Sequence, residues 1–170
     1  MKAFVPELVS LPDRKVLTIT SIGDPNSVGV GVFTNLYGTA YATKFKTFKP
    51  RGIKMAIGKL TARWPDAHIK PKDSWTGIWS VALPDYVTES DIIQKDPANP
   101  VKFTVWAGGT YAQILHKGPY SAEGPTVAKL HEFIEAHGVK MADIIGIHEE
   151  EYLTSPDAKD MKTIIRYKIS

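Results

Sequence analysis

The order of secondary-structure signals repeats once along the chain, and this repeat limits the folds open to it. Residues 14–22 alternate and are rich in β-branched side chains, which is typical of a strand. Apolar residues then recur at helical spacing from about 27 to 46, and extended patterns follow at 53–64 and 74–86. The first unit is therefore predicted as strand-helix-strand-strand over about residues 14–87.

The same order returns after a polar, proline-containing connector at 88–100. An extended segment at 101–116, interrupted by two consecutive glycines, precedes a helical pattern at 122–137 that a glycine closes. Two further extended patterns at 144–153 and 161–169 complete the second unit.

A repeat of this kind predicts one α+β domain. A lone β-α-β-β unit covers only one face of its sheet, whereas two units bury their open faces together. When the halves are aligned at an offset of 95 residues, Gly23 falls on Gly118. We predict a single domain over residues 1–170 with duplicated β-α-β-β repeats, at about 14–87 and 101–170, an antiparallel sheet, and a ligand pocket at the pseudo-two-fold seam.

Composition narrows the possible classes. Hydrophobic residues make up 43% of the 170 residues and charged residues 23%, which is typical of a folded globular domain. The absence of cysteine excludes disulfides, thiolate catalysis and cysteine-based metal sites. No segment approaches the roughly 20 apolar residues of a membrane-spanning helix, and the first residues do not have the pattern of a secretory signal. We expect a soluble, cytoplasmic protein without a membrane partner.

Positive charge is concentrated in the first half. Residues 1–72 carry 12 lysines and arginines against 4 acidic residues, whereas residues 73–170 carry 9 against 14. The densest basic stretch contains Lys44, Lys46, Lys49, Arg51 and Lys54. Such a stretch fits a nucleic-acid-binding patch or the solvated end of a helix, where cations suit the negative end of the dipole. We favour the helix end and expect no direct DNA binding, because no helix-turn-helix, zinc-finger or RNA-binding motif accompanies the stretch.

Three consecutive glutamates, Glu149 to Glu151, lie inside the predicted strand 144–153. Alternation along a strand places His148, Glu150 and Tyr152 on one face. Burying all three carboxylates would be costly. The pattern fits two interpretations equally well. In one, a half-buried Glu150 attracts a cation or moves a proton; in the other, an edge strand carries charges that discourage aggregation.

Aromatic residues are the second candidate feature, because several of them lie on or beside predicted strands. Aromatic rings bind flat apolar or cationic ligands, although most aromatic residues in a domain simply form its core. Trp79 and Tyr111 are the strongest pocket candidates, since each lies in the middle of a strand in one of the two halves. Trp106, Tyr120 and Tyr152 are further candidates for the pocket wall.

The sequence lacks the motifs that are typical of other kinds of functional site. The five histidines form no HExxH or comparable close pair, and neither GxSxG nor a Walker or GxGxxG pattern is present. A zinc site, a serine nucleophile and a phosphate-binding loop are therefore not expected. His116 or His148 could serve as an axial haem ligand, but each is more typical of a strand surface. We predict no metal site and no cofactor.

The second half resembles the GyrI-like effector-binding domain. The resemblance is carried by the stretch from Gly109 to Tyr120, which ends in His-Lys-Gly-Pro-Tyr, by the helix that Gly138 closes, and by the segment Glu150 to Pro156 with its Glu-x-Tyr-Leu-x-x-Pro pattern. The first half fits only by its order of elements. The resemblance implies two β-α-β-β repeats around a central pocket, a fold shared with SOUL-type haem-binding proteins.

The resemblance also implies functions. Members sense or sequester small organic molecules, often cationic and aromatic, and certain stand-alone members hydrolyse cyclopropane-bearing alkylating compounds with a pocket glutamate. That glutamate falls on Glu150 and its paired tyrosine on Tyr152. We therefore expect, first, a stand-alone binding module for hydrophobic or cationic aromatic molecules. Its expected ligand-binding residues are Glu150, Tyr152, Tyr111, Trp79, Tyr120 and Trp106.

Two other functions are kept open. The first is a hydrolase of strained, cyclopropane-bearing compounds, with Glu150 as general acid or base and Tyr111 or Tyr152 hydrogen-bonded to the substrate oxygen. The second is a protein-interaction role, similar to that of a gyrase inhibitor, through the basic stretch 44–54. The sequence does not decide between binding and turnover of the ligand.

Overall fold

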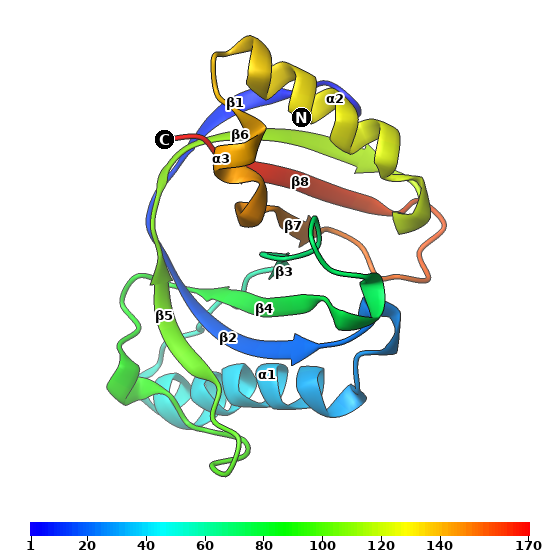
Figure 1. The fold of residues 1–170 in the computed structure, drawn as a ribbon. Helices are drawn as coiled ribbons and strands as arrows, with labels where there is room; N and C mark the ends of the chain where they lie inside the picture. Colours follow the sequence, from blue (N-terminus) through cyan, green and yellow to red (C-terminus); the bar gives the residue numbers. More distant parts are fainter.

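Eight strands form one curled antiparallel sheet in the order β1-β6-β8-β7-β3-β4-β2-β5, in a computed structural model that describes residues 1–170 (Figure 1). The strands are β1 (Glu7–Leu11), β2 (Arg14–Ile22), β3 (Leu60–Arg63), β4 (Thr76–Leu83), β5 (Lys102–Trp106), β6 (Gly109–Lys117), β7 (Glu149–Tyr152) and β8 (Lys162–Lys168). The helices are α1 (Val30–Ala42), which continues into a π-helical segment Thr43–Phe48, α2 (Gly124–Ala136) and the short α3 (Met141–Ile144).

The predicted α+β fold with duplicated units is confirmed by the strand order. The first half arranges its strands as β2-β4-β3 and the second as β6-β8-β7, and β3 pairs with β7 where the halves meet. At this seam Glu150 lies opposite Ala62 on one side and Ile165 on the other. Directly opposed residues share a sheet face, so these three side chains lie on the same face.

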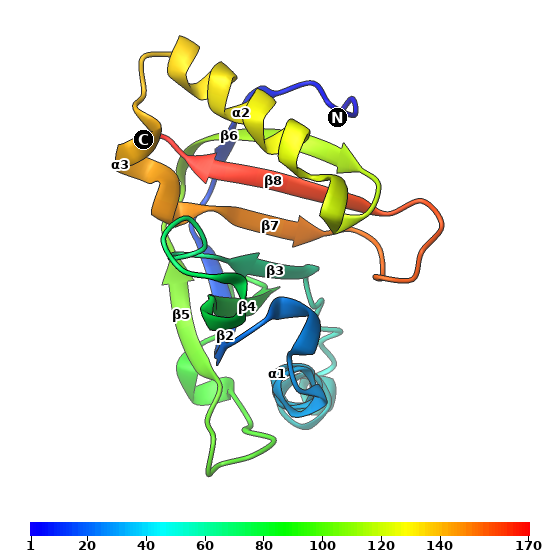
Figure 2. The same cartoon turned by 45° about the vertical axis from the view of Figure 1, so that its right-hand side comes forward.

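Both main helices cover that same face, which we call the helix face (Figure 2). Leu36 and Ala40 of α1 are fully buried in the cluster that contains Ala62. Leu130 of α2 is fully buried in a second cluster, the one that contains Ile165. The helix face therefore has two separate apolar cores, one under each helix, with the seam between them.

The halves are also joined by two bent segments that cross each other, one formed by β1 and β2 and the other by β5 and β6. The bend between β5 and β6 brings Gly108 against the bend between β1 and β2, and the Gly108 amide donates to Oδ1 of Asp13 at 2.6 Å. A Cβ at Gly108 would lie only 2.4 Å from the carbonyl oxygen of Leu11. Glycine is thus required at the point where these two bends of the backbone touch. Strand β1, which pairs with β6, is not predicted by the sequence pattern, because Pro6 and Pro12 bracket it closely.

Two predicted strands begin later than their sequence patterns suggested. The pattern at 53–64 yields only β3, which begins at Leu60. The pattern at 144–153 yields only β7, because residues up to Ile147 form helical turns. Short apolar runs such as Ile144 to Ile147 do not distinguish a helix from a strand by periodicity.

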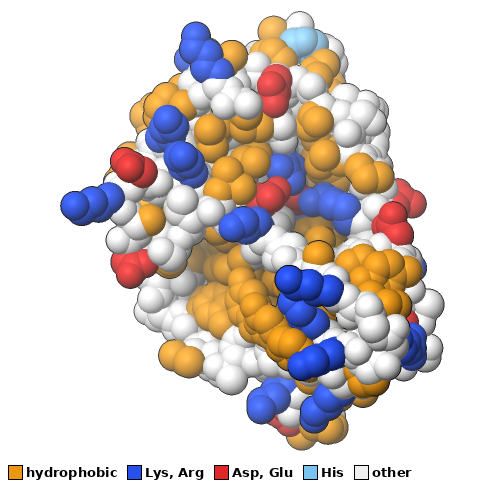
Figure 3. All heavy atoms as spheres, turned by 180° about the vertical axis from the view of Figure 1, so that it is seen from behind, with side chains coloured by type: hydrophobic (Ala, Val, Ile, Leu, Met, Phe, Trp, Pro, Cys, Tyr) orange, Lys and Arg blue, Asp and Glu red, His pale blue; other side chains and the backbone are white.

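The basic stretch lies at the end of the α1 helical segment, as expected. The side chains of Lys44 and Lys49 lie over the ring of Phe45, with Nζ 5.6 and 5.7 Å from its centroid, and Phe45 itself is exposed. Figure 3 shows Lys and Arg side chains over both halves of the molecule, with one group in the lower half of the view beside a hollow with hydrophobic side chains. None of the helices has the length and apolar character needed to cross a bilayer.

Candidate functional site

An open cavity of about 1310 Å³ lies on the helix face, between the two halves. Its wall takes residues from α1, the strands β4 and β7, the segment before α2, and α2 itself. The aromatic residues of the wall are Phe33, Tyr37, Tyr41, Trp64, Trp75, Trp79, Tyr120, Tyr152 and Tyr167. The cavity therefore lies at the predicted seam and is rich in rings.

The rings of this wall touch one another in a row that crosses the seam. Trp79 packs edge-to-face on Trp64 and Phe33, with centroid distances of 5.2 and 4.9 Å. Tyr152 continues the row, 6.2 Å from Trp79 and 5.7 Å from Tyr120. Because the rings support each other, the wall is preorganised to contact a flat apolar ligand.

Glu150 lies at the centre of a hydrogen-bonded chain on the helix face. Its carboxylate accepts from Nε2 of His148 at 2.7 Å and from the hydroxyl of Tyr152 at 2.9 Å. The other nitrogen of His148, Nδ1, lies 2.6 Å from the hydroxyl of Tyr167, which lies 2.9 Å from Nε2 of His131. Donation in one direction, from His131 through Tyr167 and His148 to Glu150, satisfies the hydrogen-bonding groups of every member.

These contacts determine which side chains of this hydrogen-bonded chain are ionised. Burial opposes the ionisation of Glu150, but hydrogen bonding and electrostatic attraction from His148, together with the hydrogen bond from Tyr152, outweigh it and lower its pKa. Burial and then the charge of Glu150 raise the pKa of Tyr152 well above its ordinary value. Burial and the neighbouring His148 lower the pKa of His131. At neutral pH Glu150 is therefore ionised, whereas Tyr152 and His131 are neutral.

A second carboxyl, Glu123, which no sequence motif marks, lies beside Glu150. It directly precedes α2 and lines the cavity. Its Oε1 atom is buried with no hydrogen-bond donor in reach, yet the side chain is a hydrogen-bond partner of Glu150. Burial and then the Glu150 charge raise the pKa of Glu123 to about 9. A proton on Glu123 that is donated to Glu150 accounts for both observations.

His116 fixes the segment that carries Glu123 and Tyr120. Its side chain is almost fully buried, and its Nδ1 lies 2.7 Å from Oγ1 of Thr126 at the start of α2. Its Nε2 lies 3.1 Å from the carbonyl oxygen of Pro119. Since both ring nitrogens of His116 are engaged, as are those of His148, neither residue offers a free nitrogen to a haem iron. We assign His116 a structural role.

Two of the predicted pocket residues lie elsewhere. The structure brings Glu150, Tyr152, Trp79 and Tyr120 together on the cavity wall, but it places Tyr111 and Trp106 outside the cavity. Tyr111 alternates with Ala112, which packs under α2, so its ring points to the other face of the sheet. There Tyr111 and Trp106 each lie 5.5 Å from the guanidinium carbon of Arg14. The expectation that these two rings line the pocket is therefore wrong.

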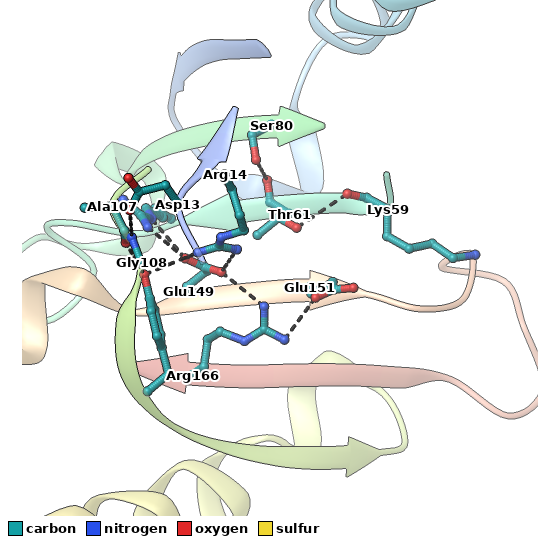
Figure 4. Close-up of polar contacts among 12 residues, drawn as sticks. Asp13, Arg14, Lys59, Thr61, Ser80, Ala107, Gly108, Glu149, Glu151 and Arg166 are labelled. Atoms are coloured by element: carbon teal, nitrogen blue, oxygen red, sulfur yellow. Dashed lines mark hydrogen bonds and ion pairs between the residues drawn. The ribbon is translucent and has the colours of Figure 1, made fainter. Parts of the chain in front are cut away.

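The same opposite face explains the two flanking glutamates (Figure 4). Glu149 is completely buried and accepts from Arg14 at 2.7 Å, from Arg63 at 3.0 Å and from Arg166 at 3.3 Å. Glu151 pairs with Arg166 at 2.9 Å. The edge-strand interpretation of these charges is wrong, because β7 lies between β3 and β8 in the middle of the sheet.

Comparison with known proteins agrees with this architecture. The family model of the GyrI-like small-molecule-binding domain matches residues 4–169. Among solved structures, a hydrolase from Listeria innocua is 25% identical, with 99% of this chain and 93% of that chain covered and a TM-score of 0.79. An uncharacterised conserved protein from the same organism is 26% identical, with the same coverage of 99% and 93% and a TM-score of 0.80.

A more distant likeness concerns the fold alone. The C-terminal domain of EcmrR is 16% identical, with 98% of this chain and 97% of that domain covered and a TM-score of 0.62. No curated protein sequence matches the chain at a significant level.

Proposed function

The chain belongs to the family of GyrI-like small-molecule-binding domains, and on that premise we propose that it binds flat, apolar aromatic molecules that carry a positive charge. The observation that carries this proposal is the ionised carboxylate of Glu150 in an aromatic cavity. Aromatic ring faces attract cations, and they do so more strongly where water is displaced. A cation on the ligand also compensates a carboxylate that has left bulk water.

The contrast between neighbouring glutamates supports this proposal. Glu149 is neutralised by three arginines of the same chain. Glu150 forms an ion pair with no lysine or arginine, and its partners are His148 and Tyr152. Because Glu123 retains its proton at neutral pH, the two carboxyls together carry one negative charge. The site is therefore matched to a ligand with one positive charge.

Binding of rhodamine 6G, a planar cationic dye, tests the proposal by fluorescence anisotropy. We expect Glu150→Gln to weaken binding by about 1–3 kcal/mol, which is roughly 5- to 150-fold in Kd. Glu151→Gln is the matched control, since it makes the same chemical change one residue away on the opposite face. The anionic xanthene dye fluorescein should bind much more weakly than rhodamine 6G. Equal affinity of Glu150→Gln and the wild type for rhodamine 6G would refute the role of the carboxylate.

We propose hydrolysis of strained cyclopropane-bearing electrophiles as a second candidate function. It is favoured by two adjacent carboxyls with opposite protonation states, an arrangement suited to acid-base catalysis. The 25% identity to the Listeria innocua hydrolase also supports it.

In this reaction Glu150 takes a proton from water as the water oxygen bonds to the ring carbon. The strained carbon–carbon bond breaks, and its electron pair moves into a conjugated carbonyl whose oxygen accepts the proton of Glu123. The pair then again holds one proton. Turnover followed by mass spectrometry should be lost in Glu150→Gln and kept in Glu151→Gln, and a wild-type rate equal to the uncatalysed rate would exclude this function.

A further inference from the structure

We propose that the Glu123–Glu150 pair holds one shared proton before a ligand binds and releases it when a cationic ligand enters, so that affinity rises with pH. This inference rests on the proposed binding function and adds a form of regulation to it. The shared proton makes the site a receptor in which a ligand cation and a proton compete for the same two carboxyls.

The geometry of the pair requires a proton. Glu123 and Glu150 line the same cavity, the Oε1 atom of Glu123 is buried there, and a hydrogen bond between the two side chains contributes to the pKa shift of each carboxyl. Ionised carboxylates only accept hydrogen bonds, so two carboxyls can bond to each other only when one of them is protonated. The buried, donorless Oε1 atom of Glu123 shows that no group of the protein donates to it. Glu150 already accepts from His148 and Tyr152, which stabilise its charge. The proton therefore resides on Glu123.

No lysine or arginine forms an ion pair with either carboxyl of the pair, and the basic group in contact with Glu150 is His148. The titratable groups nearest to it are Tyr120 from the segment before α2, His148 and Tyr152 from β7, Tyr167 from β8 and His131 from α2. Two lysines also line the cavity, Lys59 and Lys72, and neither forms an ion pair with either carboxyl. A cationic ligand therefore brings a permanent positive charge close to both carboxyls.

The size of the effect follows from this placement. A positive charge within about 4–6 Å lowers the pKa of a carboxyl by about 1–3. Starting from about 9, the pKa of Glu123 then falls to the neutral range when a cation is bound. Between these two values the protein alone is protonated and the complex is not, so each bound ligand expels up to one proton into the solvent. In this range Kd falls by up to about tenfold for each increase of one in pH.

Isothermal titration of rhodamine 6G in phosphate and in Tris at pH 8 tests the proposal, because the difference in heat between the buffers counts released protons. We expect about 0.5–1 proton per dye for the wild type, and a Kd that falls between pH 6.5 and 8.5. Glu123→Gln should still bind, since its amide can donate to Glu150 as the protonated acid does, but it should release no proton. Glu132→Gln, an exposed change on α2, is the matched control and should behave like the wild type.

The outcomes separate this inference from the proposed function. Rhodamine binding without proton release by the wild type overturns the inference and leaves the binding function intact, and so does undiminished release by Glu123→Gln. Failure of the wild type to bind overturns both. A measurement without ligand adds an independent check, because carbon-13 spectra of the glutamate carboxyls should show one group that titrates above pH 7 in the wild type and is missing in Glu123→Gln.

Discussion

Two neighbouring glutamates should have opposite effects when each is replaced by glutamine. Glu149 is fully buried and accepts four hydrogen bonds, two from Arg14 and one each from Arg63 and Arg166. Removal of its charge leaves Arg166 paired with Glu151 and leaves Arg14 and Arg63 without a paired carboxylate. Loss of one partner from a buried ion cluster costs about 3–5 kcal/mol. That is a large part of the 5–15 kcal/mol by which a domain of this kind is typically stable.

Glu150→Gln should change stability far less. Its side chain accepts from His148, Tyr152 and the protonated Glu123, and a glutamine keeps one acceptor oxygen at this position, so we expect a change within about 2 kcal/mol in either direction. Urea unfolding followed by tryptophan fluorescence gives the free energy of unfolding, and anisotropy of rhodamine 6G gives Kd for the same samples. Glu149→Gln should lose stability and keep its dye affinity, whereas Glu150→Gln should do the reverse.

A cost of less than about 1 kcal/mol for Glu149→Gln would mean that the arginine cluster does not depend on its carboxylate. Equal weakening of dye binding by both variants would also contradict the expected difference. That result would mean that the two faces of β7 are not separated as the register of the sheet requires.

Three further outcomes follow from the structure. Gly108→Ala should lower the free energy of unfolding by at least about 2 kcal/mol, because its Cβ would meet the backbone of the crossing strand. Gly31→Ala in α1 should be neutral or stabilising by up to about 1 kcal/mol, because its Cβ meets nothing within 4 Å. Thermal melts of the two variants compare these effects. Hydrogen bonds from Lys70 and then Thr76 lower the pKa of Asp66 to about 2, below its unfolded value of 3.8. This stabilisation is present above about pH 4 and is lost as the pH falls toward 2. In urea titrations, the free energy of unfolding should therefore fall less between pH 5 and pH 2.5 for Asp66→Asn than for the wild type. His116→Phe keeps a ring of similar size but frees the segment before α2, so the melting temperature should fall and rhodamine 6G should bind several-fold more weakly; unchanged binding would mean that the segment is held by other contacts.

Local periodicity in the sequence was sufficient to predict much of the fold. The repeated order of strand and helix patterns was enough for the duplicated α+β fold, because each signal depends on residues a few positions apart. Alternation along one strand placed His148, Glu150 and Tyr152 on one face, and their hydrogen bonds link residues only two positions apart.

Tertiary structure decided what depends on long-range register. Glu149 meets Arg14 across 135 residues, and nothing in the pattern of either segment shows that they face each other. Glu123 meets Glu150 only because His116 holds the segment before α2 over the seam. Tyr111 points away from the cavity because the strand pairing of β6 assigns its face, and a shift of one residue in register would reverse every side chain. The sequence by itself therefore determined which residues belong to each strand and share a face, whereas pairing between distant strands determined which faces enclose the cavity and which charges meet.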